Sequence, residues 1–594
     1  MSLRRSLRPG LLVVWAIAAA ITGCPGTPPR SDATGTAGDG GGSAGSGGAT
    51  SSGGQGGEGG LVIAGGGGGG PCDVTCSGDL HAVVDCTGTV VKTCPDDQGC
   101  GPGFECIPAC EAATAAKSTI GCEYYTRAGW YGCFAVYVLN SWSVPISISV
   151  DNGAGSLDAS LIARIPTGNG QAITYAPLPG GMLPPDEVAI LFLAGSGCPD
   201  GVQPPGSIGD KPLHVTTSAP VVAYDIDPYG GGDSAVTSAS LLIPTSAWDT
   251  NYVAVQPWPF GPNSQNPRLT IIAAEDQTSV TINPTAAITG GFVNGASVPG
   301  TAANTPATYV LQQGESLHFE QEAELTGSAI LSDKAIGVIG SSGCINIDAC
   351  CCDGAHQQIP PVRALGNEYV AVRYRNRVEG KEEAPPWRIV GAVDGTTLTY
   401  DPAPPAADAP TTLNLGQVFM FRAAGPFVVK SQDEDHPFYM AGYMTGAGDF
   451  ADAGDPEFVN VIPAQQYLSE YTFFADPTYP ETNLVLVRSR GKDGAFKDVT
   501  LDCAGVVTGW QPIDAAGDYE HTRFDLVRGN FEKQGNCDNG RRQISSEGPF
   551  GLTVWGWGTH ATDATFNSTY VSYAYPAGAR VQSINDVVVL PEPK

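Results

Sequence analysis

Residues 243–255 read IPTSAWDTNYVAV, and the chain uses the same frame two more times. It recurs as PPVRALGNEYVAV at residues 360–372 and as IPAQQYLSEYTFF at residues 462–474. Each copy has a proline, a large apolar residue four positions later and a tyrosine eight positions later, and a strand-like pattern follows the tyrosine. These positions are Pro244, Trp248 and Tyr252, then Pro361, Leu365 and Tyr369, then Pro463, Tyr467 and Tyr471. Such a repeat indicates an array of similar units.

Other stretches recur in the same order around this frame. The hairpin pattern IIAAEDQTSVTINP (271–284) reappears as IVGAVDGTTLTYDP (389–402). There is almost no helical period, so the sequence predicts an all-β fold with four tandem units of about 100–120 residues. We expect the units to be β-sandwich-like, and a propeller with two short blades per unit is the alternative. The expected units are residues 133–243, 244–359, 360–461 and 462–575.

The N-terminus is typical of an export signal. Three arginines precede the apolar run Leu11–Ala20, which is too short to span a bilayer as a helix. The next residues, Ile21–Cys24, resemble the bacterial lipoprotein lipobox, in which the signal is cut before a cysteine that is then acylated. We therefore expect residues 1–23 to be a lipoprotein signal peptide and Cys24 to be the lipid attachment site. An ordinary signal peptide that happens to contain a cysteine is the alternative.

Residues 24–71 are predicted to be a disordered tether. Their Gly/Ser-rich sequence buries too little apolar surface to fold. A lipid anchor with a flexible tether holds a folded domain clear of a membrane surface. Because Pro25 and not Asp follows Cys24, analogy with better-known bacteria favours the outer membrane. The expected location is exported, with the lipid anchor in the bacterial outer membrane or at the cell surface.

The charge balance excludes one class of partner. The chain has 30 basic and 60 acidic residues, which gives a formal net charge of −30. Nucleic-acid binding needs a basic footprint, so we expect no nucleic-acid partner. We expect no cofactor and assign no metal ligands, although clustered loop carboxylates leave weak Ca²⁺ binding open.

Export places the cysteines in an oxidising compartment, which favours disulfides. If Cys24 carries lipid, 16 of the 17 cysteines remain. Seven of them fall within residues 72–121, a segment too short to build an adequate core alone, so we expect a small disulfide module there rather than a zinc site with His81. The disulfide candidates are Cys72, Cys76, Cys86, Cys94, Cys100, Cys106, Cys110, Cys122, Cys133, Cys198, Cys344, Cys350, Cys351, Cys352, Cys503 and Cys537.

The densest cysteine cluster is CINIDACCCDGAHQQIPP at residues 344–361, in a loop at the end of the second unit. Disulfides are the favoured interpretation. A zinc site that uses Cys344, Cys350 and His356, or a catalytic thiol, are the alternatives. Elsewhere, we expect Cys503 to pair with Cys537, because they flank one excursion of the fourth unit, and Cys198 to pair with a distant cysteine.

Acidic and aromatic loop residues are further candidates. Two acidic stretches offer oxygen ligands for Ca²⁺, but their spacing does not fit a calcium-binding loop, so solvated carboxylates are the favoured interpretation. We expect Trp258 and Trp387, in Pro-rich loops, to be candidates for ligand binding, with core packing as the alternative, and His560 to be exposed. The acidic residues are Asp433, Glu434, Asp435 with the adjacent His436, and Asp449, Asp452, Asp455 and Glu457.

Two stretches resemble the IgGFc-binding protein N-terminal domain family. They are HVTTSAPVVAYDIDPYGGGDSAVTSASLLIPTSAWDTNYVAV and AIGVIGSSGCINIDACCCDGAHQQIPPVRALGNEYVAV, and the second contains a Cys-Cys-Asp step, a nearby His, Gln-x-Pro-Pro and Gly-x-x-Tyr. We assign the resemblance to residues 122–594. It implies an extracellular, disulfide-containing, all-β binding or structural module, and it brings no catalytic residues.

Together these features predict an exported, lipid-anchored surface protein that presents a repeated β scaffold to an extracellular protein or glycan, without catalysis. Two other functions are the alternatives. One is a structural envelope or coat protein without a specific ligand. The other is an envelope hydrolase with its site between Cys344 and His356.

Overall fold

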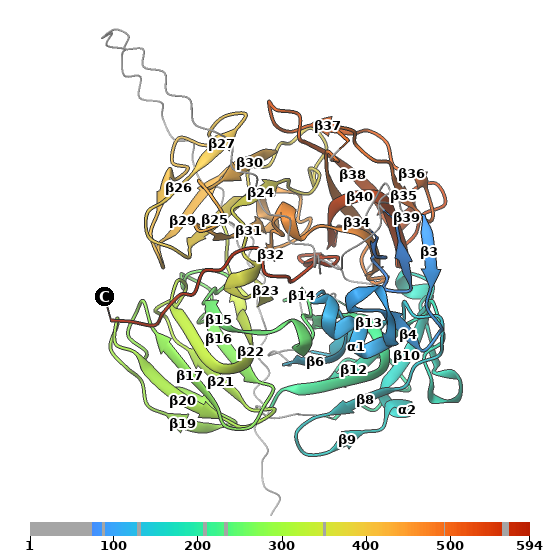
Figure 1. Ribbon diagram of the computed structural model, residues 1–594, viewed down its shortest axis with the longest axis horizontal. Helices are drawn as coiled ribbons and strands as arrows, with labels where there is room; N and C mark the ends of the chain where they lie inside the picture. The colour runs from blue at the N-terminus through green and yellow to red at the C-terminus, as the bar shows by residue number, and fades with distance from the viewer. Residues whose placement is uncertain are drawn as a thin grey trace, which may run out of the picture. The chain divides into compact units, whose positions relative to one another are not determined.

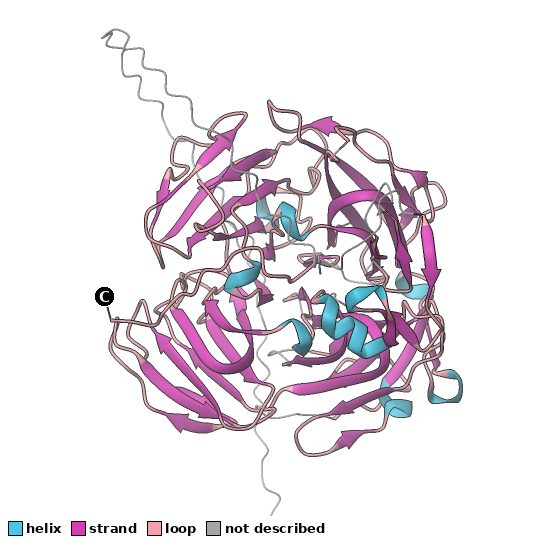
Figure 2. Cartoon of the chain, in the orientation of Figure 1, coloured by secondary structure: helices cyan, strands magenta, loops and turns pink. Residues whose placement is uncertain are grey.

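The computed structural model describes residues 74–85, 89–127, 132–205, 211–230, 236–348, 352–491, 493–560 and 569–593. Strands dominate these residues and helices are short, as Figure 2 shows. The prediction of an all-β fold is therefore confirmed. The expected signal peptide, Cys24 and the expected tether lie outside the described residues, as do Cys72, Cys86, Cys350 and Cys351. No helix in the described part of the chain is long and apolar enough to cross a membrane.

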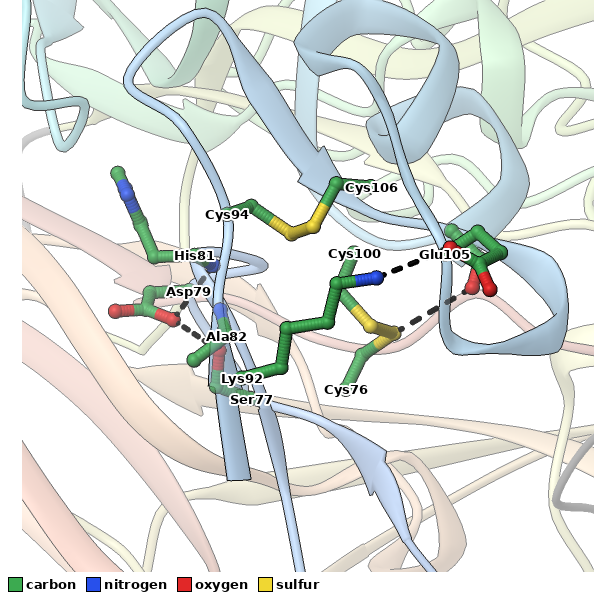
Figure 3. Close-up of a disulfide and its surroundings, with 11 residues drawn as sticks. Cys76, Ser77, Asp79, His81, Ala82, Lys92, Cys94, Cys100, Glu105 and Cys106 are labelled. Carbon is green, nitrogen blue, oxygen red and sulfur yellow. Dashed lines mark hydrogen bonds and ion pairs between the residues drawn. A yellow bond between two sulfur atoms is a disulfide. The ribbon is translucent and has the colours of Figure 1, made fainter. Parts of the chain in front are cut away.

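The cysteine-rich segment folds as a small sheet and hairpin stapled by disulfides. Figure 3 shows two of them, Cys76–Cys100 and Cys94–Cys106. A third, Cys110–Cys122, joins helix α1 to the first strand of the next sheet. The segment also packs on that sheet, because Trp142 Nε1 donates to the carbonyl of Asp96 at 2.6 Å. Its elements are β1 (Thr75–Cys76), β2 (Ala82–Val84), β3 (Val90–Thr93), β4 (Gln98–Cys100), β5 (Cys106–Pro108) and α1 (Ala109–Ala116).

The first sheet group is one nine-stranded antiparallel sheet in which β6, β7, β8 and β14 all pair with the long strand β13. It begins earlier than the expected start at residue 133, since β6 already belongs to the sheet. Its elements are β6 (Ile120–Thr126), β7 (Phe134–Leu139), β8 (Ile148–Asp151), β9 (Ser156–Leu157), α2 (Ala159–Ile162), β10 (Ala163–Thr167), β11 (Thr174–Pro177), β12 (Val188–Ala194), β13 (Leu213–Asp227) and β14 (Ser238–Leu241).

The second group repeats this plan in nine strands around the 17-residue strand β22. β15 and β23 pair with β22 as β6 and β14 pair with β13. The elements are β15 (Asp249–Val253), β16 (Arg268–Ala273), β17 (Thr278–Asn283), β18 (Gly291–Val293), β19 (Ala296–Val298), β20 (Ala307–Leu311), β21 (Ser316–Glu320), β22 (Ala329–Ile345) and β23 (Asp353–Ile359).

In the third group the long strand is divided into β30 and β31, and its strands form three smaller sheets. Residues Asp433 to His436 lie in the turn that separates the two halves. The elements are β24 (Glu368–Ala371), β25 (Pro386–Gly391), β26 (Thr396–Thr397), β27 (Thr399–Asp401), β28 (Thr412–Leu413), β29 (Val418–Arg422), β30 (Phe427–Lys430), β31 (Phe438–Met444) and β32 (Glu457–Asn460).

The fourth group is again a nine-stranded sheet, built around the 18-residue strand β40. β33 and β41 both pair with β40. The elements are β33 (Leu468–Ala475), β34 (Glu481–Ser489), β35 (Val499–Leu501), β36 (Gly505–Val506), β37 (Gln511–Pro512), β38 (Tyr519–Arg528), β39 (Glu532–Lys533), β40 (Gly540–Trp557) and β41 (Ser572–Pro576).

In the first, second and fourth groups the long strand changes register near its middle, so its two halves pair with different neighbours and the sheet wraps its own core like half of a barrel. In the third group, two facing sheets enclose a core that includes Trp387, Phe421 and Phe427. These arrangements agree with β-sandwich-like units. The alternative of two short blades per unit is not what the structure shows, since each of the other three groups is a single bent sheet.

The repeat frame explains how each group begins. Its proline precedes a short 3-10 turn in all three copies, and its large apolar residue is buried. In the second and fourth groups that residue packs against a glycine of the long strand. A Cβ atom at Gly337 would lie 2.5 Å from the ring of Trp248, and one at Gly551 would lie 2.5 Å from the ring of Tyr467. Glycine is therefore required where these rings cross the strand.

The frame's tyrosine bonds two backbone groups at once. The hydroxyl of Tyr369 donates to the carbonyl of Phe438 at 2.5 Å and accepts from the amide of Gly366 at 3.0 Å. Tyr252 and Tyr471 make the same pair of bonds in their own groups. Tyr124, which precedes the expected first unit, donates to the carbonyl of Val221 in the same way. A buried tyrosine thus fixes the bend of all four groups.

Neighbouring groups are joined by polar contacts across their seams, and the fourth group also contacts the first. The pairs are His356–Asp225 between the second and first groups, Arg388–Glu324 between the third and second, Arg375–Glu481 between the third and fourth, and Tyr137–Asp476 between the first and fourth. The C-terminal residues bind the start of each group, at Thr119, Asn251, Arg363 and Gln466. The four groups therefore form one connected structure.

The tyrosine bonds predict a specific loss of stability. We expect Tyr369→Phe to lower the free energy of unfolding by about 1–3 kcal/mol, because it leaves a buried amide and a buried carbonyl without their partner. Urea unfolding of the variant and the wild type measures the difference. Tyr400→Phe is the control, since its hydroxyl donates only to the carbonyl of Pro410 in a half-buried position. Equal losses in the two variants would contradict this role for the frame's tyrosine.

Candidate functional site

Four short strands meet where the sheet groups contact one another. We call β14, β23, β32 and β41 the inner strands. Each contacts the next, and β41 contacts β14. In Figure 1 the labels of β14, β23 and β32 lie near the middle of the view, while β19 and β27 lie at its periphery. All four begin at one end, which we call the loop end. At the start of β41, the Ser572 amide donates to the side chains of Thr237 and Asp353, and its hydroxyl donates to the carbonyl of Asp455.

The side chain of Gln357 links all four inner strands. From β23, its Nε2 donates to the carbonyls of Ala239 at 2.8 Å, Phe458 at 3.1 Å and Ala574 at 3.2 Å. Gln357 is fully buried, so these bonds replace the water that its amide nitrogen would otherwise need, while its Oε1 has no partner among the described residues. The inner strands are thereby held in one register.

Three carboxyl groups are buried at the loop end of the inner strands. Asp353, Asp455 and Glu457 have no solvent exposure. Burial raises the pKa of each well above its usual range, and Asp455 and Glu457 raise that of Asp353 further. Glu457 Oε1 accepts from the Ser238 hydroxyl and from its neighbour's amide, whereas its Oε2 has no partner among the described residues. These groups therefore favour the neutral, protonated form.

The cysteine cluster lies beside this site. Cys344 and Cys352 form a disulfide across the hairpin that β22 and β23 make. His356, four residues on, places Nε2 2.8 Å from Asp225 Oδ1 in the first group, and its side chain is 14% exposed. Burial opposes the charge on His356, but the Asp225 carboxylate outweighs it and raises the His356 pKa. The cluster thus staples a hairpin and joins two sheet groups.

The connections that lead into the inner strands end at the loop end, where the strands begin. They are residues 228–237, 346–352, 445–456 and 558–571, and parts of three of them lie outside the described residues. In the third connection, Arg377 donates to the carbonyls of Thr445 and Ala453 at 2.8 Å and lies 4.1 Å from the ring of Phe450. The buried arginine holds this connection in place, while Asp449 remains exposed.

The two candidate tryptophans lie in different environments. Trp387 is 2% exposed and its Nε1 donates to the carbonyl of Ala423, so its ring faces the core of the third group. Trp387 is therefore a core residue and not part of a binding surface. Trp258 is half-buried and packs edge-on against Tyr443 at 5.2 Å, next to Phe260, which is 42% exposed. Trp258 remains a candidate.

The candidate acidic residues lie in different environments. Asp433 bonds its neighbour His436 in an exposed turn, and Asp452 bonds His560, whose side chain is 61% exposed. Asp455 and Glu457 instead lie in the buried carboxyl cluster. Within the described ranges, no three His, Cys, Asp or Glu side chains are placed to hold a metal ion.

Six disulfides join described cysteines. They include Cys503–Cys537, the pair that the sequence predicts, and they give Cys198 the distant partner Cys133. The full set is Cys76–Cys100, Cys94–Cys106, Cys110–Cys122, Cys133–Cys198, Cys344–Cys352 and Cys503–Cys537.

Sequence reasoning missed the buried carboxyl cluster, although the repeat contains a signal for it. Asp353 and Asp455 each lie eight residues before a repeat proline, Pro361 and Pro463. Residues in the same frame of a repeat occupy equivalent places, so this match places both carboxyl groups at the start of an inner strand. The unusual environment of Glu457 has no comparable local signal.

The buried carboxyl groups predict how stability changes with pH. Because the folded-state pKa of Glu457 lies above the unfolded value of about 4.3, its contribution to stability is complete below that pH and is lost as pH rises through the folded pKa. Glu457→Gln keeps the hydrogen-bond acceptor but has no proton to lose. We expect it to raise the free energy of unfolding by about 1–3 kcal/mol at pH 8 and to change it little at pH 4.5.

Urea unfolding of both proteins between pH 4.5 and 8.5 measures this effect. Glu322→Gln, at an exposed position, is the matched control and should leave the pH dependence of stability unchanged. Parallel pH profiles for wild type and Glu457→Gln would contradict the assignment.

Comparisons with known proteins place the chain in a family. A search of curated proteins finds no match. The family model described as IgGFc binding protein matches residues 238–556, from the first residue of inner strand β14 to the penultimate residue of β40. This match covers more than half of the chain, and the chain therefore belongs to the IgGFc-binding protein family.

Proposed function

We propose that this chain is an exported, lipid-anchored binding protein of the bacterial cell surface, which uses the loop end to hold an extracellular protein or glycan without catalysis. The family suggests a binding function and an extracellular protein partner. The six disulfides are typical of exported proteins.

The observation that carries the proposal is that the four inner strands begin at one end of a buried core, each after a different connection. Gln357 and the buried carboxyl groups hold the inner strands, while the connections differ in sequence and length. Binding residues are disproportionately found on loops that a rigid scaffold positions. A binding protein is therefore the function that this geometry supports best.

The cysteine cluster gives little support to the alternative of a hydrolase. The sulfur of Cys344 is bonded to Cys352, so it is not a free nucleophile. The imidazole of His356 is held by Asp225 at a seam between two groups. Both residues thus have structural partners.

The lipid anchor of the proposal rests on the lipobox-like residues Ile21–Cys24. The Gly/Ser-rich residues that follow supply a tether, and acylation of Cys24 would keep the folded part at the cell surface.

A photo-crosslinking residue at position 449, in the third connection, tests the binding proposal on cells that display the full chain. We expect a covalent adduct with one extracellular protein or glycan. A crosslinking residue at Asn304, in an exposed hairpin of the second group, is the control and should give none. A structural coat without a ligand would give equal, unspecific labelling from both crosslinking positions, and that result would contradict the proposal.

The lipid anchor is tested separately: Cys24→Ala should release the protein into the medium.

A further inference from the structure

The seam between the third and fourth groups contains a cluster of cations. Segment 373–377 reads Arg-Tyr-Arg-Asn-Arg and follows β24. It faces His521, Arg523 and Asp525, which alternate along one side of β38.

Arg375 takes the carboxylates of this seam. Its Nε lies 2.8 Å from Asp525 Oδ1 and its Nη2 bonds Glu481. Its guanidinium also lies 4.6 Å from the ring centre of Trp557. Asp525 is further shared with Arg528 at 3.6 Å. The carboxylates of Glu481 and Asp525 are thus already paired, and neither bonds Arg373 or Arg523.

Arg373 and Arg523 have neutral partners. Arg373 is 7% exposed and donates to the carbonyls of Ala424 and Tyr374 and to Asn376 Oδ1. Arg523 Nε donates to the backbone carbonyl of Arg373 at 2.7 Å, so the Arg523 guanidinium lies beside the backbone of Arg373. Neither has a carboxylate partner within the described ranges. Burial and the charge of Arg373 lower the pKa of Arg523 to about 10, so Arg523 remains a cation at neutral pH.

His521 adds an unpartnered polar atom to the cluster. It is 7% exposed, and its Nδ1 has no hydrogen-bond partner among the described residues. Burial and the charge of Arg523 lower its pKa to about 4, so the imidazole is neutral near pH 7.

Space adjoins Arg373. A cavity of about 40 Å³ lies in the seam and is lined by Arg373 together with apolar residues that include Val372, Val485 and Val487. Arg523 is not part of this lining, and its side chain remains partly exposed at the seam.

We propose that Arg373 and Arg523 form a binding site for one oxyanion group, a sulfate or a carboxylate, at the seam between the third and fourth groups. Guanidinium groups bind such anions through paired, charge-assisted hydrogen bonds, and an anion would offset two partly buried cations that lack a carboxylate partner. The chain's net charge of −30 disfavours a polyanion, so the ligand is a single anionic group, either a free ion or part of a sugar acid. This site is independent of the binding proposed for the loop end.

Calorimetric titration of the full chain with sodium sulfate and with sodium glucuronate, at constant ionic strength, tests the proposal. We expect saturable binding with one site per chain. Stronger binding of glucuronate would identify a sugar acid as the source, and stronger binding of sulfate a free ion. Arg523→Gln should weaken binding about tenfold. Arg490→Gln, which alters an exposed arginine of the same sheet, should leave binding unchanged.

If Arg523→Gln does not fold, a second variant can be titrated in its place. Arg523→Lys retains the charge but lacks the forked donors, and it should bind sulfate more weakly than wild type does. Absence of saturable binding of both anions to the wild type would overturn the proposal. Equal affinity in wild type and the Arg523 variants would also overturn it.

Discussion

One buried side chain, Gln357, connects the four inner strands, and the rest of the structure depends on the contact that it makes. An amide without partners is costly in a core, so its three bonds to β14, β32 and β41 fix where those strands lie. Each inner strand pairs with the long strand of its own group, and each long strand carries the bend that a frame tyrosine holds. The positions of the inner strands therefore constrain the long strand of every group.

The same alignment explains why the loop end is the candidate site. Inner strands that begin together bring their four preceding connections together, although those connections are more than 100 residues apart in sequence. Three buried carboxyl groups lie directly beneath them. The repeated strands thus form the scaffold, and the connections between them vary in sequence and length. This is the arrangement expected of a binding protein.

The sequence predicts the fold class and the frame well, because proline, apolar residue and tyrosine recur at fixed spacing and each plays the same local role. It fails where a residue's environment is built from distant segments. Asp455 and Glu457 resemble solvated loop residues until β23 and β41 cover them, and Trp387 follows prolines typical of a loop but lies within β25. The contact between Arg373 and Arg523 joins residues of different groups, so no local sequence pattern predicts it.

Native-state hydrogen exchange tests most directly whether the inner strands act as one unit. The amides of β14, β23, β32 and β41 should exchange most slowly, and all four should share one free energy of opening that equals the global value. Glu457→Gln should shift the four values together at pH 8. Separate opening free energies for the four inner strands, with some groups opening while others stay closed, would contradict a shared core.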